Sequence, residues 1–124
     1  RWGNWFGRNQ LLFCEDVMVI QTIVHYSLHF LAPALIARIF FRENWKQAYL
    51  IMLASMLIDL DHLLATPIFD PHRCSIGFHP LHSYIAIGLY PIFLFFKNTR
   101  VLGAGLLFHM LTDYLDCFWS GFLD

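Results

Sequence analysis

Ten side chains that can bind a metal ion lie inside, or at the mouths of, stretches apolar enough to cross a membrane. They are His25, His29, Asp59, Asp61, His62, His79, His82, His109, Asp113 and Asp116. A charged group at the centre of a bilayer costs about 2.5–3.5 kcal/mol, so several such groups together need a partner that offsets this cost. A bound divalent cation is the simplest such partner.

The spacing of these residues places most of them in pairs. Four pairs are three or four residues apart, the spacing that puts two side chains on one helix face: His25 and His29, Asp59 and His62, His109 and Asp113, and Asp113 and Asp116. His79 and His82 have the same spacing, and the neighbouring Ser83 could hydrogen-bond a ligand or substrate. Asp61 lies about 200° around an α-helix from Asp59 and cannot share its face without a distortion. We therefore predict that Asp61 supports a ligand or binds a second ion.

The ligand types indicate which ion would bind. Mixed imidazole and carboxylate sites suit zinc, manganese or iron, whereas a haem would leave the carboxylates without a role. We predict zinc, as one or two ions, with manganese or iron as alternatives. The predicted ligands are His25, Asp59, His62, His82, His109 and Asp113, with His29 and His79 as additional candidates. For His29 the competing interpretation is an interhelical hydrogen bond, and for His79 and Asp116 it is simple solvation.

Composition indicates a small membrane protein. Of the 124 residues, 58% are hydrophobic and 14% are charged, against about 25% charged in ordinary domains. The mean hydropathy is +0.54. The eight Lys and Arg are scattered singly and the net charge is -1, which argues against a nucleic-acid surface. Cys14, Cys74 and Cys117 lack the CxxC spacing of a zinc or redox site, and we predict that they are inert.

Four apolar segments predict an all-α polytopic membrane protein, a bundle of four transmembrane helices. The predicted spans are Met18 to Phe41, about Gln47 to Phe69, near Pro80 to Phe96, and about Arg100 to Phe122. Residues 18–124 then form a single domain. Residues 1–17 are more polar and Trp-rich, and are either an interfacial helix or a non-native extension.

The basic residues predict the orientation. Five of them fall in the loops that join spans one to two and three to four: Arg38, Arg42, Lys46, Lys97 and Arg100. The positive-inside rule makes these loops cytoplasmic, so both termini and the loop with Arg73 face outward. At a rise of about 1.5 Å per residue, His25, Asp59, His82 and Asp113 each lie roughly 20 Å from a basic anchor. They therefore predict one polar layer in the outward half of the membrane.

Three segments carry a resemblance to a family: LIDLDH (57–62), FHPLHS (78–83) and FHMLTDYLD (108–116). Together they resemble small bacterial integral-membrane proteins of uncharacterised function, similar in pattern to the LexA-regulated membrane-bound metal-dependent hydrolases. The resemblance covers residues 18 to about 119, with FHPLHS in place of the usual Arg-Gly-containing run. It implies a metal site and a bacterial inner (cytoplasmic) membrane location.

The leading functional hypothesis is a membrane-embedded metal-dependent hydrolase of a lipid or a lipid-linked phosphate or ester. Asp61 or Asp116 would take the proton, Ser83 would contact the substrate, and Arg73 is the outward candidate to contact a phosphate. We expect an open coordination position between the third span and loop 70–77. The alternatives are a divalent-metal transporter, disfavoured by the apolar cytoplasmic end, and a structural metal site without activity. The lipid bilayer is the expected partner, and an oligomer is compatible with these features.

Overall fold

The computed structural model describes residues 2–68 and 74–120, with side chains from residue 15 to residue 119. Every regular element in this part of the chain is helical. The α-helices are α1 (Trp2–Phe40), α2 (Trp45–Ala54), α3 (Tyr84–Leu89) and α4 (Arg100–Ser120). The 3-10 helices are η1 (Arg42–Asn44), η2 (Ser55–Leu64), η3 (Pro80–His82) and η4 (Tyr90–Phe95). The predicted all-α class is confirmed, and Arg73 lies outside the described residues.

Three of the helical segments are long and apolar enough to cross a membrane: Glu15–Phe40, Arg42–Leu64 and Arg100–Trp119. The fourth, Tyr84–Phe95, is apolar but shorter, and a perpendicular span needs about 20 residues. Pro80 occupies the first turn of η3 as predicted. Ser83 then takes an extended conformation and caps α3, so the predicted third span is divided at this residue.

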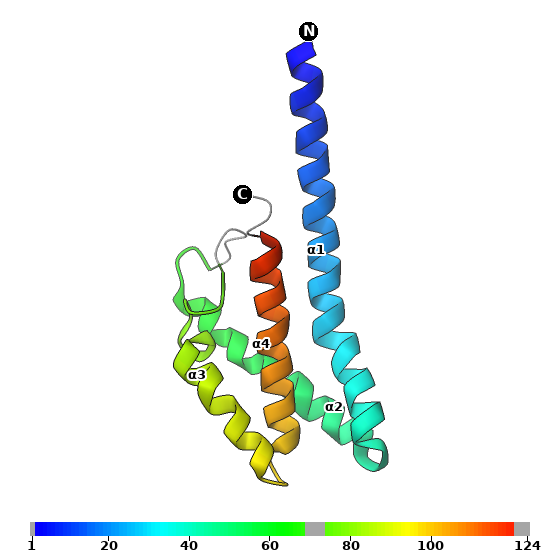
Figure 1. The fold of residues 1–124 in the computed structure, drawn as a ribbon, viewed down its shortest axis with the longest axis vertical. Helices are drawn as coiled ribbons and strands as arrows, with labels where there is room; N and C mark the ends of the chain where they lie inside the picture. Colours follow the sequence, from blue (N-terminus) through cyan, green and yellow to red (C-terminus); the bar gives the residue numbers. More distant parts are fainter. Residues whose placement is uncertain (1, 69–73, 121–124) are drawn as a thin grey trace.

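Helix α4 is the centre of the bundle. It contacts α1, α2, η2 and η4, and Figure 1 shows it beside α1 and running in the opposite direction. Two glycines allow this close packing. A Cβ added at Gly103 would lie 2.8 Å from Cβ of Phe93, and one added at Gly105 would lie 3.0 Å from Cα of Met52. These small residues let α4 fit between η4 and α2.

The bundle is polar inside and apolar outside. The largest fully buried side chains in the described part are His82, His109 and Thr112. Large apolar side chains are instead exposed, with Ile85 at 78% and Phe95 at 84%. A soluble domain buries such residues, whereas a lipid-facing surface displays them. The distribution therefore indicates an integral membrane protein, in which the polar cluster is buried beside a small apolar cluster of Tyr90, Leu106 and Met110.

The two ends of the bundle differ chemically. The Arg100 guanidinium lies 5.8 Å from the ring centroid of Phe41, so the loops that end α1 and begin α4 lie at one end. This end carries the described basic side chains, as predicted. The other end carries a disulfide between Cys74 and Cys117. The prediction of inert cysteines is therefore wrong for this pair, because folding brings together two residues that no local motif links.

Candidate metal centre

Four separate elements supply the polar cluster. η2 carries Asp59, Asp61 and His62. α1 carries His25 and His29. His79 and His82 lie at η3, where the third apolar segment begins, and α4 carries His109 and Asp113. All ten predicted metal-binding side chains belong to the described residues, and ion pairs and ring contacts connect them.

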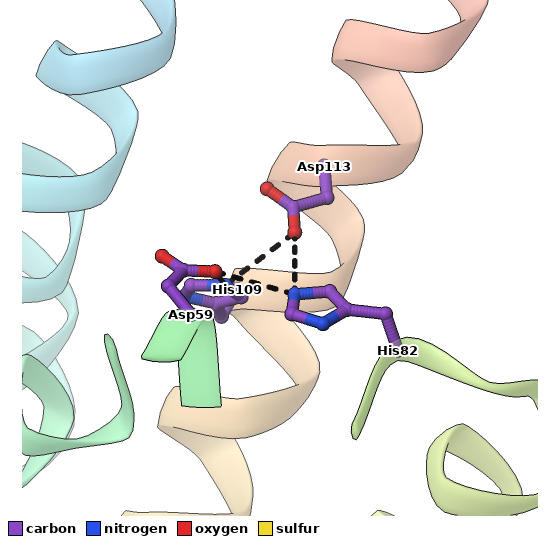
Figure 2. Close-up of side chains that lie close together, drawn as sticks. All are labelled: Asp59, His82, His109 and Asp113. Atoms are coloured by element: carbon purple, nitrogen blue, oxygen red, sulfur yellow. Dashed lines mark hydrogen bonds and ion pairs between the residues drawn. The ribbon is translucent and has the colours of Figure 1, made fainter. Parts of the chain in front are cut away.

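Asp59, His82, His109 and Asp113 form a group of four donors, which we call the primary group (Figure 2). Nε2 of His82 lies 3.0 Å from Oδ2 of Asp113 and 3.3 Å from Oδ1 of Asp59. Nε2 of His109 lies 3.0 Å from the same Asp59 oxygen and 3.4 Å from the same Asp113 oxygen. Two imidazoles and two carboxylates thus present one donor atom each to a shared centre.

These imidazole–carboxylate separations fit donors placed around one ion. Four ligand atoms at about 2.0–2.1 Å from a zinc ion in a tetrahedral site are about 3.3 Å from one another, and the four imidazole–carboxylate separations are 3.0, 3.0, 3.3 and 3.4 Å. Nε2 of His82 and Oδ2 of Asp113 are buried 3.0 Å apart, but neither makes a hydrogen bond of good geometry within the described residues. Buried polar atoms are normally satisfied, so the primary group could hold a metal ion.

Asp61 supports His82 from the opposite side of the ring. Its Oδ2 lies 3.1 Å from Nδ1 of His82 and accepts a hydrogen bond of 2.8 Å from the Leu81 backbone N–H. With Nδ1 held by a carboxylate, the ring is positioned to offer Nε2 as a ligand, as in carboxylate–histidine–metal arrangements.

The 3-10 geometry of η2 lets Asp59 and Asp61 both reach His82. In an α-helix these two residues would point about 160° apart, but the three residues per turn of a 3-10 helix reduce the angle to about 120°. This is the distortion that the predicted arrangement required. One short element thereby contacts both ring nitrogens of His82, Asp59 at Nε2 and Asp61 at Nδ1.

A second group comprises His25, His29 and Asp113. Oδ1 of Asp113 lies 3.4 Å from Nε2 of His29, while its Oδ2 belongs to the primary group. Nδ1 of His25 and Nε2 of His29 are buried without a hydrogen-bond partner among the described residues. Asp113 therefore lies between two groups of donors, the position of a carboxylate that bridges two ions.

A third group comprises Asp61, His62 and His79. Nδ1 of His62 lies 3.1 Å from Oδ1 of Asp61, its Nε2 lies 3.0 Å from Oγ of Ser75, and its ring stacks on His79 at 4.0 Å. His62 thus lies at the edge of the primary group, with its Nδ1 3.7 Å from Asp59. Of the six predicted ligands, His62 is the one that belongs to the third group and to neither of the other two.

The remaining predicted site residues lie at the margins. The Ser83 hydroxyl accepts a hydrogen bond from the Ala86 N–H at 3.3 Å and caps α3. Oδ2 of Asp116 lies 3.8 Å from Nδ1 of His25, and its Oδ1 accepts a hydrogen bond of 2.8 Å from Gln21. Sequence reasoning missed Gln21, although it precedes His25 by four residues and so shares its helix face.

A cavity of about 320 Å³ lies between α1 and α4, beside the second group. Its lining residues are Gln21, Val24, His25, Leu28, Thr112, Leu115, Asp116, Phe118 and Trp119. This differs from the predicted opening between the third segment and loop 70–77. Residues 70–73 of that loop lie outside the described part of the chain.

The chain belongs to the family of unknown function DUF6122, whose sequence profile matches residues 19–120. That range contains all ten side chains predicted to bind metal. No curated protein and no solved structure matches the chain. Because the matched family carries no assigned function, kinship with the LexA-regulated hydrolases stays a prediction.

Proposed function

We propose that this protein is a membrane-embedded metal-dependent hydrolase that acts on a lipid or lipid-linked phosphate or ester, with zinc as its ion. One observation supports this more than any other. Asp59, Asp61 and Asp113 come together in the bundle, and their ion-pair partners among the described residues are imidazoles. The described Lys and Arg side chains lie at the basic end. Divalent cations carry two positive charges each and can balance three carboxylates in an apolar bundle.

We propose two ions bridged by Asp113. The primary group would hold the first through Asp59, His82, His109 and Asp113, and the second group would hold the other through His25 and His29. Bridged pairs of this kind clamp both the attacking and the leaving oxygen in hydrolytic enzymes. The second group has three protein donors within reach of one another, which leaves a position for water and substrate.

A bound divalent cation at these positions would supply an activated water and polarise a carbonyl or phosphoryl oxygen. In this proposal Asp61 orients His82 and does not touch the substrate. Asp116 lines the cavity beside His25, so its carboxylate is better placed than that of Asp61 to accept a proton from water. Ser83 keeps the third segment in position by capping α3.

We also propose that the site lies in the outward half of a bacterial cytoplasmic membrane. Two independent features support this orientation. The basic end fits the cytoplasmic face by the positive-inside rule. The Cys74–Cys117 disulfide at the other end fits an oxidising compartment such as the periplasm.

A structural metal site is the second candidate function. The primary group favours it, because it supplies four protein donors, the number typical of closed structural zinc sites. The two proposals differ at the second group. A structural role requires one fully ligated ion, whereas hydrolysis requires an ion with an open position.

The experiment is metal analysis and hydrolysis by the purified protein in lipid nanodiscs. We expect about two zinc ions per chain and turnover of lipid esters or phosphates. Asp113→Asn should lose both ions and the activity, because its two oxygens face both groups. Glu43→Gln, an exposed carboxylate at the basic end, is the matched control and should change neither. A single, fully protein-ligated ion without hydrolysis would replace this proposal with the structural one.

A further inference from the structure

The cavity between α1 and α4 has an apolar body and a polar end. Its apolar wall is formed by Val24, Leu28, Leu115, Phe118 and Trp119. The polar lining comes from Gln21, His25, Thr112 and Asp116. His25 belongs at the same time to the second group with His29 and Asp113. An apolar ligand in this cavity would therefore end at the metal-binding side chains.

The cavity lies between two segments that are long and apolar enough to cross a membrane, Glu15–Phe40 and Arg100–Trp119. Some of its lining side chains are exposed, including Phe118 at 58% and Leu115 at 45%. In a membrane such a cavity would lie at the depth of the lipid chains, so a hydrocarbon chain could enter it without passing through water.

The volume limits the occupant to one chain. The cavity volume of about 320 Å³ is at the lower end of the range for small-molecule sites, about 300–1,000 Å³. The cavity fits a single medium-length chain and is too small for the body of a two-chain phospholipid.

The charge at the polar end favours an uncharged head group. The carboxylate that lines the cavity is Asp116, which the proposed function leaves without an ion. An anion brought beside it in an apolar setting is repelled more strongly than it would be in water. An ester carbonyl carries no net charge and avoids this cost, whereas a phosphate does not.

We propose that this cavity binds the hydrocarbon chain of a single-chain, uncharged lipid ester, which enters from the bilayer and presents its ester group beside His25 and Asp116. The inference rests on the proposed hydrolase function and names its substrate class. One water is consumed. Its oxygen bonds to the acyl carbon, the ester C–O bond breaks, and Asp116 passes the water's proton to the leaving alcohol oxygen. The products are a carboxylic acid and an alcohol.

The test fills the cavity without changing a metal-binding side chain. Leu115→Trp places a larger ring in the apolar wall, and Leu111→Trp, one turn earlier on α4 and 50% exposed, is the matched control outside the lining. Binding is measured in nanodiscs with a tritiated decyl ether, which cannot be hydrolysed. Val24→Trp fills the cavity from α1 and replaces Leu115→Trp if that variant does not fold.

We expect Leu115→Trp to weaken decyl ether binding about tenfold or more, and to lower the ratio of kcat/KM for a decanoyl ester over an acetyl ester by a similar factor. Leu111→Trp should change neither quantity. Equal ether binding in both variants and the wild type would overturn the inference, as would tighter binding of decyl phosphate than of the ether. If the ether binds as expected but no ester is hydrolysed, the chain-binding site stands and the proposed function fails.

Discussion

Asp61→Asn is the substitution that best separates a positioning carboxylate from a metal ligand. Asp61 contacts three groups: Nδ1 of His82 at 3.1 Å, the Leu81 N–H at 2.8 Å and Nδ1 of His62 at 3.1 Å. An asparagine oxygen in the place of Oδ2 can still accept from both Leu81 and His82. The substitution therefore keeps the position of the His82 ring and removes the negative charge behind it.

The expected loss of zinc affinity follows from that charge. A carboxylate at Nδ1 makes the opposite ring nitrogen a stronger donor, and loss of such a partner typically costs 10–100-fold in metal affinity. We expect a decrease of this size at the primary group, equivalent to about 1.4–2.8 kcal/mol. The number of ions bound at saturating zinc should not change. Asp113→Asn should instead lower that number, because both oxygens of Asp113 face donor groups.

The assay is zinc competition against a chelator of known affinity, with elemental analysis of the protein after equilibrium. Tyr90→Phe is the matched control, because the Tyr90 hydroxyl donates to the carbonyl of Leu81. It perturbs the residue that Asp61 holds without altering any carboxylate, and zinc affinity should stay within about twofold, ~0.4 kcal/mol. An unchanged affinity in Asp61→Asn would refute the positioning role. Loss of an ion would show that Asp61 is itself a ligand.

Three further predictions test the fold and the site. In thermal unfolding, Gly103→Ala should destabilise the bundle by about 1–3 kcal/mol, because the added Cβ would lie 2.8 Å from Phe93. Gly88 has open space around it, so Gly88→Ala is the control and should be neutral or stabilising by up to ~1 kcal/mol. Reduction of the Cys74–Cys117 disulfide, which closes 43 residues, should lower the unfolding free energy by up to ~4 kcal/mol. In intact cells a membrane-impermeant thiol reagent should label this pair only after an impermeant reductant is added. Zinc retention on dialysis should fall as the pH is lowered from 8 to about 5, because coordination needs neutral imidazoles.

The sequence predicted the membrane class and the convergence of the polar residues because both follow from local pattern. Apolar runs longer than a bilayer is thick define helices, and three- or four-residue spacing defines their faces. Four helices with one polar face each must bring those faces together to avoid lipid. His82, His109 and Asp113 meet for this reason, although they come from separate elements.

What the sequence could not predict depends on helix type and on tertiary approach. No residue pattern in Ser55–Leu64 distinguishes a 3-10 helix from an α-helix, yet that difference turns Asp61 from a residue on another face into a contact of His82. The disulfide joins residues that only the packed bundle brings together. The cavity depends on how α1 and α4 lie against each other, so the side of the bundle on which it lies could not be predicted either.

The contacts of His82 with two carboxylates also constrain how a site of this kind can work in a membrane. His82 is fully buried, and both of its ring nitrogens face aspartates of one short helix. A shift of η2 along its axis would therefore change both contacts together. The position of His82 and the basicity of its Nε2 therefore both depend on η2. The half-buried donors His25 and Asp116 lie on α1 and α4 instead, beside the cavity. In the proposed site, the fully buried ligand is thus fixed by a short helix, and the side chains that would meet a lipid substrate lie on two other helices.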